Sequence, residues 1–319
     1  MADRRTGSLL AALAAVCALL AIAAPGFFSR ENLIDVLLGN VPVLIVALGA
    51  TLVLLTGEID ISVGSVFAIC GVVAGVTALA GAPMAITIVA TCAAGALLGA
   101  LNGALVAYAA LPSIVVTLAT MVALRDGLRW ATQGAWVQDL PDSFQWFGLS
   151  QSSYPIVACG IAALLQAALA YGLRHVAAGR AVYATGSDPD AARLAGFDVA
   201  GVKAAVFTIA GALTGLAAIV NDVRFNQVPS NAGIGLEMKV IAAVVVGGTA
   251  IRGGRGTMTG TLLGVALLAI VGPALVFLGV SAYWERAIQG AIILAAVALD
   301  AWRLRRRQPG LSRAAVQPS

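Results

Sequence analysis

The sequence predicts an all-helical integral membrane protein whose chain crosses the bilayer about ten times. Hydrophobic residues make up 60% of the 319 residues and charged residues only 11%, which leaves too little polar surface for a soluble fold. Apolar stretches follow one another with short polar breaks between them. Because a helix rises about 1.5 Å per residue, roughly 20 apolar residues cross the hydrocarbon core. We expect the whole chain, 1–319, to form a single transmembrane domain.

The hydropathy pattern divides the chain into ten predicted spans. In order, they cover residues 8–24, 36–55, 63–80, 84–108, 114–131, 154–173, 204–220, 238–250, 258–278 and 286–302. The eighth is short and flanked by glycines, which predicts a tilted or broken helix that lines a cavity: Gly247, Gly248, Gly253 and Gly254. The first follows Arg4 and Arg5 and also has the pattern of a secretory signal peptide. We favour an uncleaved anchor, because the later spans hold the chain in the membrane in either case.

The distribution of basic residues predicts the orientation of the chain. With a cytoplasmic N-terminus, most arginines lie inside, including those of the tail 303–319, and only Arg30, Arg224 and Arg286 lie outside. An even number of spans then places the C-terminus in the cytoplasm as well. The long outer loop, 132–153, contains no basic residue, as the same rule expects.

Several functions are excluded by what the chain lacks. The four cysteines fall inside predicted spans without metal-binding spacing, and His175 is the only histidine, so we expect no metal site. Neither Lys203 nor Lys239 follows a glycine, which excludes a phosphate-binding GK[ST] loop. If ATP drives this protein, another chain must bind it, and we expect no cofactor here. The net charge of +4 comes from the inner-face arginines and does not indicate a nucleic-acid partner.

Glycines at helical spacing predict close helix packing. Gly95, Gly99 and Gly103 form one row, and Gly211 and Gly215 form another. Such small-xxx-small patterns allow helix backbones to approach closely in lipid. We expect these rows to be packing surfaces.

The inner loop 174–203 is polar and contains the pattern of a short helix. Ser187 or Asp188 can cap its N-terminus, Pro189 suits the first turn, Asp190 complements the helix dipole, and Gly196 supplies the stop. Its surface would carry Arg193, Leu194 and Phe197. This helix either docks on a partner or only closes the loop.

The segment LTGEIDISVGS, residues 55–65, follows the second span and carries two carboxylates, Glu58 and Asp60. Two acids without a basic neighbour are unusual in a short inner loop. Asp60 or Ser62 capping the next helix would explain part of the pattern. Gly57 and Gly64 frame the segment.

Polar residues in or near the spans are candidates for a transport pathway. Asn102 can simply bond across helices, and Arg125 must face protein or water because a charge at mid-bilayer costs about 2.5–3.5 kcal/mol. A second group, near the outer face, combines amides with an aromatic ring, which suits a neutral polyol but also a hydrated loop: Asn221, Phe225, Asn226 and Gln227.

LTGEIDISVGS resembles a motif of permeases from bacterial binding-protein-dependent sugar importers, the ribose, xylose, rhamnose and autoinducer-2 group. The resemblance continues through residues 101–128, 183–199 and 235–264, and it covers nearly the whole chain in the expected order. The chain departs from that family at Glu58, where the motif usually has glycine.

The resemblance implies a permease of the type II ATP-binding-cassette importer fold in the bacterial inner membrane. It implies a dimer with a second permease, identical or not, together with two ATPase subunits and a periplasmic sugar-binding protein. The permease would perform no chemistry and would move a simple sugar or a sugar-like solute such as ribose, rhamnose or autoinducer-2. Its coupling segment to the ATPase would include Ser187, Asp188, Asp190, Arg193, Leu194, Gly196 and Phe197.

Two other functions remain open at this point. An autonomous carrier or channel could also use ten helices, but few charges lie at mid-span for ion coupling. Permeases for branched-chain amino acids share the architecture, whereas the motif at 55–65 has the sugar-type form.

Overall fold

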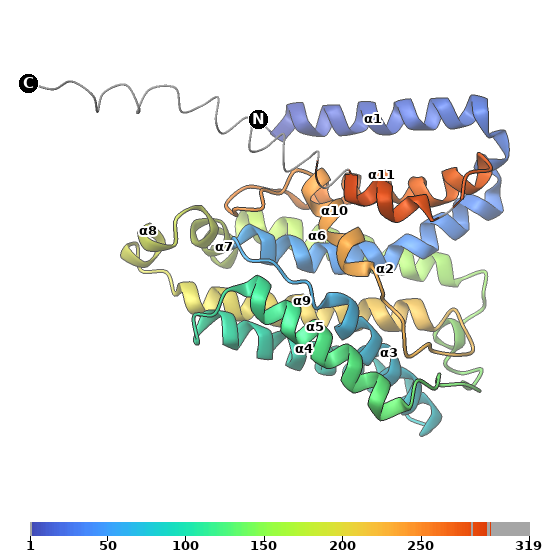
Figure 1. Ribbon diagram of the computed structural model, residues 1–319, viewed down its shortest axis with the longest axis horizontal. Coiled ribbons are helices and arrows are strands. Elements are labelled where there is room, and N and C mark those ends of the chain that lie inside the picture. Colours follow the sequence, from blue (N-terminus) through green and yellow to red (C-terminus); the bar gives the residue numbers. More distant parts are fainter. Residues whose placement is uncertain (1, 282, 292–293, 295–319) are drawn as a thin grey trace, which may run out of the picture.

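The computed structural model describes residues 2–281, 283–291 and 294, and in this part the chain is a bundle of α-helices (Figure 1). The only β pairing among the described residues is a single antiparallel bridge between Val137 and Val228. The prediction of an all-helical membrane bundle is confirmed.

Eleven α-helices and two short 3-10 helices lie wholly within the described part, and residues 284–291 are helical as well. The α-helices are α1 (Ala2–Ala23), α2 (Arg30–Leu55), α3 (Val63–Leu79), α4 (Met84–Ala107), α5 (Ser113–Thr132), α6 (Tyr154–His175), α7 (Ala177–Ser187), α8 (Pro189–Leu194), α9 (Val199–Asp222), α10 (Leu236–Val246) and α11 (Met258–Phe277). The 3-10 helices are η1 (Pro25–Phe28) and η2 (Gln145–Gly148).

Nine of the ten predicted spans coincide with helices, and most of their ends agree within a few residues. Six described helices are long and apolar enough to cross a membrane: α1, α2, α4, α6, α9 and α11. The other three helices at predicted spans do not meet this standard. Helices α3 and α10 are too short, with 17 and 11 residues, and α5 carries three charges. The short eighth span is thereby confirmed. The tenth, 286–302, lies mostly outside the described residues.

The inner loop 174–203 contains more helix than the sequence predicted. Besides the expected short helix, an 11-residue helix, α7, fills its first part. No side chain caps the start of α7, and its sequence, AAGRAVYATGS, mixes apolar and polar residues. The usual signals of a helix start are therefore missing, although buried Ala181 and Val182 hold α7 against the bundle.

Helix α9 lies at the centre and packs against α4, α2 and α3. The glycine rows of α4 and α9 face one another, which confirms that both are packing surfaces: a Cβ on Gly211 would lie 3.0 Å from Cα of Gly99, and one on Gly215 would lie 2.5 Å from the Thr91 carbonyl oxygen. Real Cβ contacts are rarely this short. Glycine therefore sets how closely these two helices approach.

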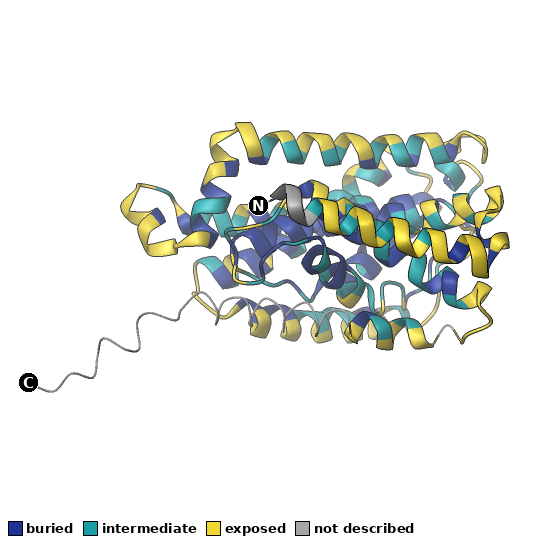
Figure 2. Ribbon diagram, turned by 90° about the horizontal axis from the view of Figure 1, so that it is seen from above, coloured by how far each residue is buried: buried dark blue, intermediate teal, exposed yellow. Residues whose placement is uncertain are grey.

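Buried residues lie in the middle of the bundle, whereas the outer helices expose many side chains (Figure 2). The second half of α2 is buried along its entire length. In contrast, α1 packs against α11 and leaves apolar side chains such as Leu19 and Ile22 exposed. Large exposed apolar surface of this kind suits contact with lipid.

The two ends of the bundle differ in structure. Helices α7 and α8 project from one end, toward which the start of α1 also lies, while the segment 132–153 is at the opposite end (Figure 1). After α2, the chain runs back along the bundle before α3 begins (Figure 1). Non-helical backbone therefore passes between helices, where it must be hydrogen-bonded by protein groups.

Candidate functional site

Helix α8 has the local structure that its sequence predicted. The Asp188 carboxylate accepts hydrogen bonds from the N–H groups of Asp190 and Ala191, each at 3.0 Å. Pro189 occupies the first position, and Gly196 adopts φ +86° just beyond the C-terminal end. Asp188 is thus the cap, whereas Ser187 is the last residue of α7.

The outer surface of α8 carries one strongly exposed apolar side chain. Leu194 is 91% exposed, and Phe197, three residues later, is partly buried. Arg193 and Asp190 form an exposed ion pair of 2.7 Å, which supports an isolated helix only slightly. Ala192 faces inward and is buried. A rigid projection with an exposed leucine is a surface that a partner protein can cover.

Three chain segments meet behind α8. The N–H of Gly254 donates to the carbonyl oxygen of Leu55 at 2.9 Å, which joins the loop before α11 to the end of α2. A Cβ on Gly186 would lie 2.7 Å from the Gly254 nitrogen, and one on Gly253 would lie 2.6 Å from the nitrogen of Gly57. Only glycine permits this approach, so the end of α7, directly before α8, rests on the start of the 55–65 motif.

A mostly buried ion pair connects the motif to the helix that follows α8. The ammonium of Lys203, in the first turns of α9, contacts the Glu58 carboxylate. Their side chains are only 19% and 14% exposed. This pair was not predictable from sequence spacing, because the two residues are 145 positions apart.

The other motif carboxylate belongs to a buried hydrogen-bond network. Asp60 accepts bonds from the backbone N–H of Ser62 at 2.8 Å and from its hydroxyl at 2.6 Å. Asn102 of α4 donates to the same hydroxyl oxygen at 2.8 Å. Burial raises the pKa of the Asp60 carboxyl, and the two bonds from Ser62 oppose this shift. Ser62 is the N-cap residue of α3, but its side chain makes no hydrogen bond to the helix, so side-chain capping does not explain these residues.

Four predicted pathway residues line one cavity of about 440 Å³. Residues from α2, α3 and the connection between α9 and α10 complete its wall. The lining consists of Gly39, Pro42, Val43, Phe67, Asn221, Phe225, Asn226, Gln227, Pro229, Ala232, Gly233 and Leu236. The other two predicted residues, Asn102 and Arg125, do not line it. Asn102 bonds to Ser62, while Arg125 lies behind the wall and donates to the Ala232 carbonyl at 2.8 Å.

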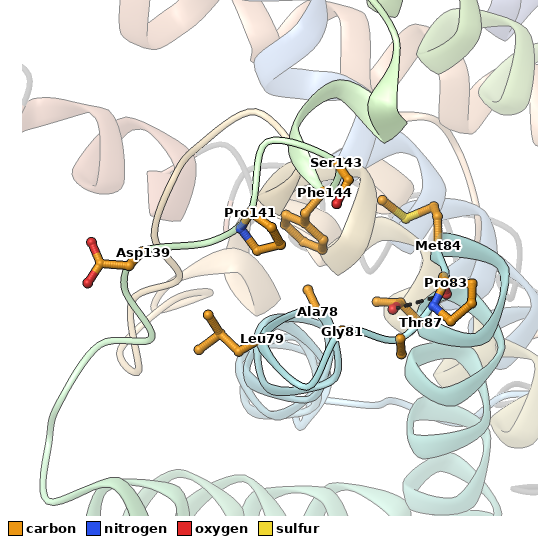
Figure 3. Close-up of a pocket in the computed structure, with 11 residues that line it drawn as sticks. Ala78, Leu79, Gly81, Pro83, Met84, Thr87, Asp139, Pro141, Ser143 and Phe144 are labelled. Carbon is orange, nitrogen blue, oxygen red and sulfur yellow. Dashed lines mark hydrogen bonds between the residues drawn. The ribbon is translucent and has the colours of Figure 1, made fainter.

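A second cavity, of about 530 Å³, lies where the outer segment 132–153 covers the turn between α3 and α4 (Figure 3). Pro141 and Phe144 cover it from the outer segment, and Met84 and Thr87 contribute from α4. The carboxylate of Asp139 points away from the other lining residues (Figure 3). Its lining is mostly apolar, and the sequence therefore did not indicate this cavity.

Comparison with known proteins decides the class of this bundle. The family described as "Branched-chain amino acid transport system / permease component" matches residues 32–297. The chain belongs to this permease family. Two relatives from Escherichia coli are similar over most of their length. The ribose import permease protein is 35% identical over 91% of this chain and 92% of its own, and the autoinducer 2 import system permease protein is 37% identical over 90% and 85%.

The autoinducer 2 import system permease protein of Photorhabdus laumondii is 33% identical over 93% of this chain and 90% of its own length. No solved structure was found to match. The permease is thus an integral inner-membrane subunit of an ATP-binding-cassette importer, which works with an ATPase and a periplasmic binding protein. It is not an enzyme, because ATP hydrolysis belongs to the separate ATPase.

Two site residues of the permease were missed by sequence reasoning. Lys203 was considered only as a candidate phosphate-loop residue, yet it is the partner of Glu58. Glu237 lies in the first turn of α10, near Gly64 and Arg125: a Cβ on Gly64 would collide with the Glu237 carboxylate and lie 3.1 Å from Nη2 of Arg125. A charged residue at the start of a short span was the available signal for Glu237.

Proposed function

We propose that this permease translocates a neutral sugar or sugar-like solute, in the class of ribose, rhamnose or autoinducer-2, through the cavity that contains Asn221 and Gln227. The amides of that cavity can each donate to and accept from hydroxyl groups, and the rings of Phe67 and Phe225 offer apolar faces for C–H groups. The names of the relatives, ribose and autoinducer 2 import permeases, support the same class.

The composition of the cavity is the observation that carries this proposal. None of the described residues that line it is charged. An amino acid would bring a carboxylate and an ammonium group into this site, where neither would find a charged partner among those residues. An autonomous ion-coupled carrier is not favoured for a similar reason, since its coupling site needs ionisable groups.

Uptake by the complete importer tests this proposal. The permease is expressed together with its binding protein and ATPase, and uptake of radiolabelled ribose, rhamnose and leucine is compared. Gln227→Leu removes an amide at nearly constant size and should lower uptake of the transported sugar at least about tenfold, because buried hydrogen-bond partners lose their pairing. Leu236→Met, on the same cavity, is the matched control. Uptake of leucine but of neither sugar would contradict the proposal.

The assembly that we propose contains two permease subunits, identical or paired with a sister permease, two ATPases and one sugar-binding protein. Helix α8 and its flanks form the coupling segment, with both termini of the permease on the ATPase side of the membrane. The protruding Leu194, the rigid Asp188 cap and the seat on Gly57 and Gly186 support this role. Movement of an element packed in this way passes to its neighbours, as a two-state transport cycle requires.

Substitutions on α8 test the coupling role. Leu194→Asp places a charge in the apolar groove that we propose for the ATPase, and it should reduce ATP hydrolysis stimulated by the loaded binding protein at least about tenfold. Leu194→Met keeps the apolar contact and should behave like the parent. Insertion and purified yield are measured beside the ATPase rate, since Leu194 is exposed and its change should leave folding intact. Parental transport by Leu194→Asp would show that α8 does not transmit the movement.

A further inference from the structure

The side chain of Arg125 lies on the rear side of the cavity wall and forms hydrogen bonds with the backbone of that wall. The side chain extends from α5, and its Nη1 and Nη2 atoms donate to the carbonyl oxygens of Ala232 and Gly233 at 2.8 Å and 3.5 Å. Both of these residues line the cavity, whereas Arg125 does not. The guanidinium group is therefore separated from the cavity by the backbone that it holds.

The wall needs such a contact because it is not helical. Between the end of α9 and the start of α10 the chain is irregular, and Gly233 and Gly235 adopt φ values of +70° and +85°. Carbonyl groups in such a segment lack the partners that a helix would supply, and at membrane depth they require donors from the protein. Arg125 supplies two N–H groups in a fixed planar arrangement.

The first turn of α3 holds the same segment from another side. A Cβ on Gly233 would lie 2.5 Å from the Gly64 carbonyl oxygen, and one on Gly64 would lie 3.1 Å from Nη2 of Arg125. Glu237 adds a negative charge here: one of its carboxylate oxygens accepts from the N–H of Gly235 at 3.2 Å, and the other is buried without a hydrogen bond to the described residues. The wall is thus held by α3, by Arg125 of α5 and by the Glu237 carboxylate of α10.

We infer that Arg125 is a positioning residue that fixes residues 229–236 as a wall of the cavity and thereby sets the shape available to the substrate, without touching the substrate itself. The inference rests on the proposed function only in taking the cavity as the substrate site. The position of the wall is a property of the permease alone and can be measured without a substrate. A role as a direct ligand makes a different prediction, namely that the wall stays in place when Arg125 is replaced.

The chain provides a matched control one turn further along α5. Arg129 is also an arginine of this helix, but its side chain is 62% exposed and pairs with Asp126 at 3.7 Å. No hydrogen bond or ion pair described for Arg129 reaches the wall. Replacing Arg129 therefore removes the same charge from the same helix and leaves the wall contacts intact.

The experiment places a reporter cysteine in the wall of the full-length permease. The native cysteines, Cys17, Cys70, Cys92 and Cys159, are replaced by alanine. Ala232→Cys is then introduced, and its rate of modification by a small water-soluble methanethiosulfonate is measured in proteoliposomes. Arg125→Gln should raise this rate about tenfold or more, because hydrogen bonds from a charged group hold the segment in place. Arg125→Lys keeps the charge but not the fork, and an intermediate rate is expected.

Two further measurements decide against the alternatives. Phe225→Cys, in the connection just after α9 and away from the Arg125 contacts, should keep its rate in every variant. Arg129→Gln should leave the Ala232→Cys rate unchanged. Only the folded, monodisperse fraction is reconstituted, so loss of folding lowers yield without changing the rate. An unchanged Ala232→Cys rate in Arg125→Gln overturns the inference, as does an equal rise in Arg129→Gln.

Sugar uptake separates this inference from the proposed function. With ribose as the probe, a released wall should change KM more than the maximal rate in Arg125→Lys. If the modification rate of Ala232→Cys rises but uptake of every tested sugar stays unchanged, the contact between Arg125 and the wall is supported, whereas the cavity is not the transport pathway. A lowered affinity for ribose with a parental cysteine rate would instead make Arg125 a direct ligand and overturn the positioning role.

Discussion

Glu58 is the residue at which this chain departs most clearly from the motif that it resembles. Its partner is Lys203, so the carboxylate links the segment after α2 to the first turns of α9, immediately beyond α8. In the sequence, Glu58 and Asp60 stood out as two acids without a basic neighbour in a short inner loop. The sequence did not predict the partner, since sequence spacing contains no information on a pair 145 residues apart. Asp60, by contrast, is held by two hydrogen bonds from Ser62.

The Glu58–Lys203 pair should stabilise the junction between the motif and α9. Glu58→Gln and Lys203→Gln each leave one mostly buried charge unpaired, and each should lower the free energy of unfolding by about 1–3 kcal/mol. The double substitution should cost less than the sum of the two, and the exchange Glu58→Lys with Lys203→Glu should recover part of the loss. Thermal unfolding of the purified proteins compares the stability of these four variants with that of the parent permease. Strictly additive single effects would contradict an interaction between these side chains.

At the scale of elements, helix packing was more predictable than the loops. The glycine rows of α4 and α9 were visible as small-xxx-small patterns, because the spacing that exposes a backbone in lipid is a local property of one helix. Helix α7 was not visible, since burial of Ala181 and Val182 against the bundle stabilises it rather than a cap or a strong periodic pattern. The cavity wall is similar: Arg125 was apparent as a charged residue of its span, but its hydrogen bond to the wall was not, because Arg125 and Ala232 lie 107 residues apart in the chain.

The α4–α9 packing predicts opposite effects for two Gly→Ala substitutions. Gly211→Ala would add a Cβ 3.0 Å from Cα of Gly99 and closer still to the Gly95 backbone, so it should destabilise the permease by about 1–3 kcal/mol. Gly160→Ala, within α6, meets nothing within 4 Å and should be neutral or stabilising by up to about 1 kcal/mol. Thermal unfolding in the same detergent compares the two. Equal effects would show that the helices do not approach as closely as described.

At the scale of the whole molecule, the sequence predicted the class and the positions of the spans well, but not how two of them begin. Apolar length alone identifies α1, α2, α4, α6, α9 and α11 as able to span. Helices α3 and α10 begin inside the bundle, after chain that has run back between helices, so their apolar lengths are not those of independent spans. Hydropathy treats every apolar stretch in isolation, whereas such broken segments depend on neighbours for their hydrogen bonds.

The orientation of the bundle is the remaining whole-molecule prediction. The positive-inside rule places α7 and α8 in the cytoplasm and the segment 132–153 outside. In the structure these parts lie at opposite ends of the bundle (Figure 1). In a background without native cysteines, Gln145→Cys should react with an impermeant maleimide on intact spheroplasts, and Ala195→Cys should react only after permeabilisation. Ala195 is exposed and its side chain supports no described contact, so the label reports access rather than damage. The reverse pattern would invert the orientation and place α8 out of reach of an ATPase.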